Sequence, residues 1–242
     1  MNYMSKFFVG AMLLTVPCFG AVKTQKVNSI FDILQLEDKS DCEKFSLINE
    51  LGKDLSAQGR KALCEKTNKE GETPLLAALE NFRYPYIVTL LLLWGANPNT
   101  GSVKYKGQTS LHKLAGAFGE KRETTKGIFI HTHDLKISTL EQMIQKGGDL
   151  GAQEKLCRRT PVHIAAQQAT LPVVKFIVKK LAEQNKLYLL FQKDNYQRDA
   201  LKFAQEGISK KIQTQEVVEY LSKLKQYENN PDMLKAAIAS LE

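Results

Sequence analysis

The sequence predicts an all-α repeat fold, in which helix-turn-helix units form a row with a capping helix at each end. One short pattern, a helix-capping residue followed by apolar and small residues, recurs at Thr73, Thr109, Thr160 and Asp199. The copies are 36, 51 and 39 residues apart. A second apolar segment, long enough for another helix, follows each copy. Recurrence at such spacing is typical of proteins in which stacked helical units bury one another's apolar faces.

The first helix of each unit is expected to begin at the recurring residue. The side-chain oxygens of Thr73, Thr109 and Thr160 can accept a hydrogen bond from a free N–H of the first helical turn. Pro74 and Pro161 then take the first helical position, where the N–H that proline lacks is not needed. The second helices are predicted over the apolar runs 87–93, 140–144, 173–178 and 217–221.

The third copy, Thr-Pro-Val-His-Ile-Ala-Ala at 160–166, is the most complete. Two units also end in a segment that opens with glycine, at 95–99 and 147–151, where a left-handed residue can stop a helix. With these motifs in one register, residues 67–226 resemble the ankyrin-repeat family, whose signature has leucine where Val162 stands. The resemblance implies an ankyrin solenoid, in which hairpin-like loops join the helix-turn-helix repeats.

The two chain ends and one long gap lie outside the repeat pattern. Residues 21–66 keep an apolar helical period without the signature, as expected for an N-terminal helical cap or a degenerate repeat. Residues 227–242 are expected to form a C-terminal capping helix that begins at Asn230 and Pro231. The wide spacing between the second and third copies predicts an inserted loop over 118–137.

The first twenty residues have the layout of a secretory signal peptide. Lys6 precedes the apolar run 7–14, and small residues follow, so we expect cleavage near Gly20 and export to the periplasm or the medium. The alternative is an uncleaved anchor, and the protein would then be a membrane-anchored structural or envelope protein. Contact with a membrane is expected only in that case.

Export would leave three of the four cysteines in the mature chain. Cys42 and Cys64 could close a disulfide in the N-terminal segment, because an oxidising compartment permits the bond. The alternative is two small, buried thiols in helices. Cys157 has no expected role.

Catalysis requires a cluster of reactive groups held in register, and the sequence offers little of this kind. It has no phosphate-binding loop, dinucleotide fingerprint or nucleophile elbow. The resemblance assigns His112 and His163 a structural role, as hydrogen-bonding partners of neighbouring backbone. We therefore expect no enzyme, cofactor or small-molecule substrate. The alternative is a metal-dependent enzyme that uses His131, His133 and Asp134 of the insert.

Function is expected at the loops that precede each repeat motif, because the resemblance implies a concave binding face edged by these loops. The net charge of +8 favours an acidic surface on another protein, and export argues against nucleic acid. Tyrosine and arginine dominate the energetics of protein interfaces. The candidate partner-binding residues are Tyr105, Lys106, Arg158, Arg159, Tyr196 and Arg198 in the loops and Phe129 in the insert.

Overall fold

The computed structural model describes residues 29–80, 85–116, 122–123, 129–130 and 132–241. The predicted signal peptide over 1–20 lies outside these residues. The described chain is all-helical apart from two short strands, and it holds twelve α-helices and the 3-10 helix η2 (Leu187–Leu190). The strands β1 (Arg122–Glu123) and β2 (Phe129–Ile130) pair antiparallel. Among the helices described, none has the length and apolar character needed to cross a membrane.

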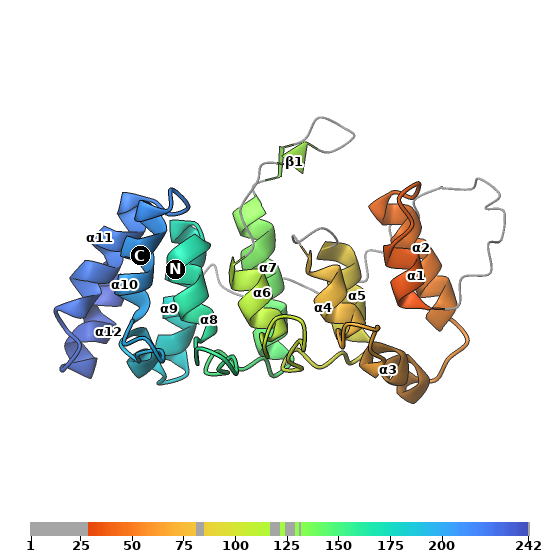
Figure 1. The fold of residues 1–242 in the computed structure, drawn as a ribbon, viewed down its shortest axis with the longest axis horizontal. Helices are drawn as coiled ribbons and strands as arrows, with labels where there is room; N and C mark the ends of the chain where they lie inside the picture. The colour runs from red at the N-terminus through yellow and green to blue at the C-terminus, as the bar shows by residue number, and fades with distance from the viewer. Residues whose placement is uncertain (1–28, 81–84, 117–121, 124–128, 131, 242) are drawn as a thin grey trace, which may run out of the picture.

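Most of the helices lie in two layers. One layer consists of α1 (Ile30–Leu34), α4 (Pro74–Ala78), α6 (Ser110–Gly116), α8 (Pro161–Gln168) and α10 (Ala200–Ser209). The other consists of α2 (Asp41–Gly52), α5 (Pro85–Leu93), α7 (Thr132–Gln145), α9 (Leu171–Glu183) and α11 (Gln215–Lys225). Each helix packs on its partner in the other layer and on the next helix of its own layer, so the pairs follow one another in chain order (Figure 1). A continuous apolar core runs along the row.

Two further helices lie near the ends of the row. The helix α3 (Ala57–Glu65) contacts α4, and α12 (Pro231–Ser240) packs on α9 and α11. The α12 helix begins as its sequence predicts, because the Asn230 side chain accepts a hydrogen bond of 3.1 Å from the Met233 N–H. Leu234 and Ile238 of α12 are buried in the core, so this helix covers one end of it.

The local signals that predict helix starts and stops are confirmed at Thr73, Asp199, Gly95 and Gly147, whereas Thr160 makes no side-chain capping hydrogen bond and its oxygen lies 2.8 Å from His163 Nδ1. Thr73 Oγ1 accepts a hydrogen bond of 3.4 Å from the N–H of Leu76, and Asp199 caps α10 in the same way. Gly95 and Gly147 are left-handed, with φ of 91° and 86°. Both follow second helices of the pattern, where they allow the chain to turn away.

The predicted loop over 118–137 is too long, because α7 already begins at Thr132. Leu135, near the start of α7, packs against the core about two helical turns before the buried Met143. Asp134 lies in the first turn, where a carboxylate is favoured by the helix dipole. These residues extend the second helix of this unit into the predicted insert.

The disulfide considered between Cys42 and Cys64 is not formed, and both thiols are free. Cys42 is exposed, whereas Cys64 is buried with its sulfur 3.8 Å from the carbonyl oxygen of Leu91 on α5. The two side chains therefore occupy different environments and do not meet. Burial raises the pKa of the Cys64 thiol to about 11, as expected for an inert core thiol.

Candidate functional site

Four similar loops precede the first helices of the repeating units, and we call them tips. The first tip is 68–72, the second 102–108, the third 154–159 and the fourth 194–198. In each tip, the N–H of the first residue donates to the carbonyl oxygen of the last residue, over 2.8 to 3.0 Å. The four tips are thus closed by the same backbone hydrogen bond, although their sequences differ.

Backbone hydrogen bonds also join neighbouring tips. The N–H of Lys155 donates to the carbonyl oxygen of Lys106 over 2.8 Å, and the N–H of Asn195 donates to that of Cys157 over 3.0 Å. The Asn195 side chain adds a 3.0 Å bond to the carbonyl oxygen of Leu156. The second, third and fourth tips therefore form one connected surface along an edge of the molecule (Figure 1).

The two motif histidines fix the first helices beneath these tips. His112 Nε2 lies 2.9 Å from the carbonyl oxygen of Arg159, and His163 Nε2 lies 2.8 Å from that of Gln192. In His112, Nδ1 accepts from the N–H of Thr109, so Nε2 carries the proton that it donates. Burial lowers the pKa of His112 to about 4, which keeps the imidazole neutral. These are the bonds to neighbouring backbone that the family resemblance implies.

Arg159, predicted to bind a partner, is held inside its own tip. Its guanidinium pairs with the buried carboxylate of Glu154, and Nη2 donates to Oε2 over 2.9 Å. Burial raises the pKa of Glu154, but hydrogen bonds from Arg159 and Gln108 outweigh burial, and the pKa lies below its usual value. Arg159 therefore stabilises the third tip, and its contact with a partner stays a prediction.

Arg198 has the same arrangement in the fourth tip. Its Nη2 donates to the buried Asp194 carboxylate over 2.7 Å, and Nη1 donates to Glu206 over 3.1 Å. The guanidinium carbon also lies 4.4 Å from the centre of the Phe203 ring. These contacts hold the guanidinium against its own tip, so Arg198 stabilises the fourth tip, and its contact with a partner stays a prediction.

Tyr105, a further predicted contact residue, is half-buried between the first two tips. Its hydroxyl lies 3.3 Å from Glu80 Oε1, and the Lys113 ammonium sits 4.1 Å from the ring centre. Lys113 in turn forms a 2.7 Å ion pair with the buried Glu72. Tyr105 thus covers a buried ion pair, and only part of its ring is open to a partner.

The charged side chains that remain open on the second to fourth tips are all cationic, and they lie among apolar and uncharged polar side chains. Val103, Leu156 and Tyr196 are 76%, 51% and 64% exposed. The only carboxylates within these three tips, Glu154 and Asp194, are both buried. We define the basic tip surface as Val103, Lys104, Lys106, Lys155, Leu156, Lys193, Asn195, Tyr196, Gln197 and Arg158.

Sequence reasoning identifies Lys106, Arg158 and Tyr196 of this surface and misses Val103 and Lys193. The exposure of Val103 could have been predicted from the sequence. It is a single apolar residue among polar turn residues, so no apolar neighbours are available to bury it. The place of Lys193 on this surface could not have been predicted. It lies before the predicted loop, and nothing in the sequence distinguishes it from other exposed lysines.

The structure leaves the insert candidates untested. Phe129 belongs to β2 and His133 to α7, but their side chains are not among those described, and His131 lies outside the described residues. Asp134 is exposed. Within the described residues, no three or more His, Cys, Asp or Glu side chains gather as metal ligands would.

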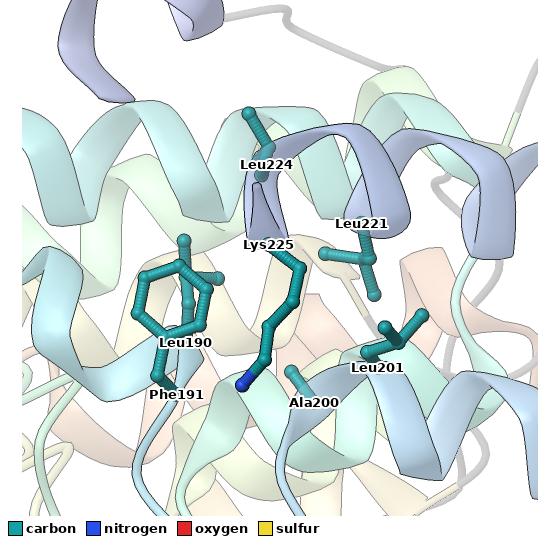
Figure 2. Close-up of a pocket in the computed structure, with 7 residues that line it drawn as sticks. All are labelled: Leu190, Phe191, Ala200, Leu201, Leu221, Leu224 and Lys225. Atoms are coloured by element: carbon teal, nitrogen blue, oxygen red, sulfur yellow. The ribbon is translucent and has the colours of Figure 1, made fainter. Parts of the chain in front are cut away.

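A small notch opens between α10, α11 and the η2 segment (Figure 2). Its volume is about 10 Å³, which is comparable with the space for one water molecule. Lys225 reaches across it and pairs with Asp199 over 2.8 Å. The notch is therefore a packing irregularity too small for a substrate. Its lining residues are Leu190, Phe191, Ala200, Leu201, Leu221, Leu224 and Lys225.

No protein-family model matches this chain. A search of curated proteins likewise finds no significant match.

Proposed function

We propose that this chain is a non-catalytic, ankyrin-type repeat protein that binds the acidic surface of another protein through its basic tip surface. The ankyrin assignment is supported by the agreement of three independent features. The motif threonines immediately precede helices, the motif histidines bond to the backbone of the following unit, and backbone hydrogen bonds join the second, third and fourth tips. Each feature recurs in the register of the sequence motif.

The observation that carries the binding proposal is the distribution of charge on the tips. Both carboxylates of the second to fourth tips are buried against arginines, whereas Lys106, Lys155 and Arg158 are exposed. Exposed apolar side chains lie among these cations. A surface that combines cations with apolar and aromatic groups favours a partner with carboxylates and apolar side chains.

The proposal is tested by affinity capture with the full chain. The variant Arg158→Ala/Tyr196→Ala removes one cation and one aromatic ring from the basic tip surface. The matched control Lys179→Ala/Tyr86→Ala removes the same kinds of groups from exposed positions on α9 and α5. Capture of one defined protein that the tip variant loses and the control retains supports the proposal. If the wild type, the tip variant and the control capture the same protein equally well, the proposal is wrong.

We also propose that the chain is exported after cleavage near Gly20, as the layout of its first residues suggests. Mass spectrometry of the mature N-terminus tests this assignment. A chain that begins at Met1 and fractionates with membranes would contradict it.

A further inference from the structure

The four tips share a left-handed position two residues before the residue that caps the following helix. Gly71, Gly107, Arg158 and Gln197 occupy this position, with φ of 74°, 87°, 58° and 61°. Glycine adopts this conformation freely, whereas a Cβ disfavours it. At this position the first two tips therefore carry the residue that suits the turn, and the third and fourth tips do not; Lys106, the residue before Gly107, is also left-handed, with φ of 56°.

Nothing in the core requires the long side chains at these two positions. Arg158 and Gln197 are both exposed. The Arg158 guanidinium makes a 2.9 Å hydrogen bond from Nε to Gln153 Oε1, a contact near the surface that an exposed side chain can lose at little cost. Glycine would suit both turns better, so the fold alone does not explain these residues.

The two positions lie on adjacent, connected tips. The Asn195 backbone and side chain bond to the carbonyl oxygens of Cys157 and Leu156, which fixes the third tip against the fourth. Leu156 and Tyr196 are exposed beside the two left-handed residues. Strained residues that persist on a rigid, exposed surface are a recognised mark of functional sites.

We propose that Arg158 and Gln197 are specificity-determining contacts for an acidic protein segment that lies across the third and fourth tips. This inference rests on the protein-binding function proposed above. A guanidinium can grip a carboxylate with two hydrogen bonds, and a glutamine amide offers a donor and an acceptor to an extended peptide backbone. The apolar faces of Leu156 and Tyr196 would receive an apolar side chain of the same segment.

The inference predicts opposite effects on stability and on binding. The probe is a fluorescein-labelled peptide of alternating glutamate and tyrosine, and binding to the full chain is followed by fluorescence anisotropy. Arg158→Gly should raise the thermal unfolding midpoint by about 2 °C, because it relieves the left-handed strain. It should weaken peptide binding about tenfold, because a hydrogen-bonded charge is lost. Gln197→Gly should act in the same directions, with a smaller loss of binding.

Lys211 provides a matched control. It is exposed, cationic and left-handed, with φ of 58°, but it follows the C-terminal end of α10 and lies outside the tips. Lys211→Gly removes the same charge and the same strain, so it should raise the unfolding midpoint and leave peptide binding unchanged.

Several results would overturn the inference. If Lys211→Gly weakens binding as much as Arg158→Gly, the peptide responds to net charge and not to this contact. If the peptide binds but Arg158→Gly has no effect, acidic segments bind elsewhere, and protein binding itself survives. If the peptide fails to bind, or an oligonucleotide of equal charge binds more tightly, the partner is not an acidic protein segment. The capture experiment with the double variants tests the proposed protein-binding function itself, independently of this peptide assay.

Discussion

Lys136 on α7 provides the sharpest test of the packing between the two layers. Its side chain is 1% exposed, and within the described structure its ammonium has no hydrogen-bond partner. Burial lowers the pKa of Lys136 to about 8, from 10.5 in an exposed lysine. The charged form is therefore destabilised in the folded protein, and we expect Lys136→Met to stabilise it, because methionine fills a similar space without a charge.

The magnitude follows from the pKa difference. The unfolded chain holds its Lys136 proton up to about pH 10.5 and the folded chain up to about pH 8, so stability rises with pH between these values. Below pH 8 the full penalty is present, and it corresponds to about 3 kcal/mol. At pH 7 the variant should therefore unfold about 6 to 12 °C higher than the wild type.

The assay is urea unfolding followed by circular dichroism at pH 7 and near pH 10. The free-energy difference between wild type and Lys136→Met should shrink as the pH rises, because the wild-type lysine becomes neutral. Lys146→Met, at an exposed position just beyond the same helix, serves as the control and should show no such convergence. A wild-type advantage at pH 7, or a difference that stays constant with pH, would refute the reasoning from desolvation.

Three further substitutions test the core and the contacts between units, each by urea denaturation. Leu91→Ala should cost about 2 to 5 kcal/mol because its side chain is fully buried in α5, and an unchanged midpoint would contradict the packing of that helix. Gly207→Ala should cost about 1 to 3 kcal/mol, since the new Cβ would lie 2.6 Å from the carbonyl oxygen of Gln167 where α8 and α10 meet; a neutral effect would show that the two helices are farther apart. His163→Leu should cost about 1 to 3 kcal/mol, because it leaves the Gln192 carbonyl without its 2.8 Å partner, and stability equal to wild type would exclude that bond.

The helices could largely be predicted from the sequence because their boundaries depend on local chemistry. A capping oxygen, a proline in the first turn and a left-handed glycine act within a few residues, and Pro74, Pro161, Pro231 and Gly95 stand where the structure begins or ends helices. The start of α7 was not predicted. Its first three residues, Thr132, His133 and Asp134, are polar, so no apolar residue marks the helix before Leu135.

The exposed surface of the tips was harder to predict, because it depends on which charges neutralise each other. Arg159 and Arg198 belong to the residue types that dominate interfaces, but each pairs with an acid at the first position of its own tip. The signal was present, since Glu154 and Asp194 precede their arginines by five and four residues. The burial of Glu154 and Asp194 could not be predicted from the sequence, because it depends on packing against the neighbouring unit.

The hydrogen bonds that join neighbouring tips use mainly backbone atoms, so the tips are held in place whichever side chains they carry. A partner bound at the proposed surface would meet loops that are already held by hydrogen bonds, so the tips would lose little conformational freedom on contact. Side chains on the tips can also be exchanged without breaking these bonds. The same frame could therefore present a different set of side chains, and a change of partner would require no change of fold.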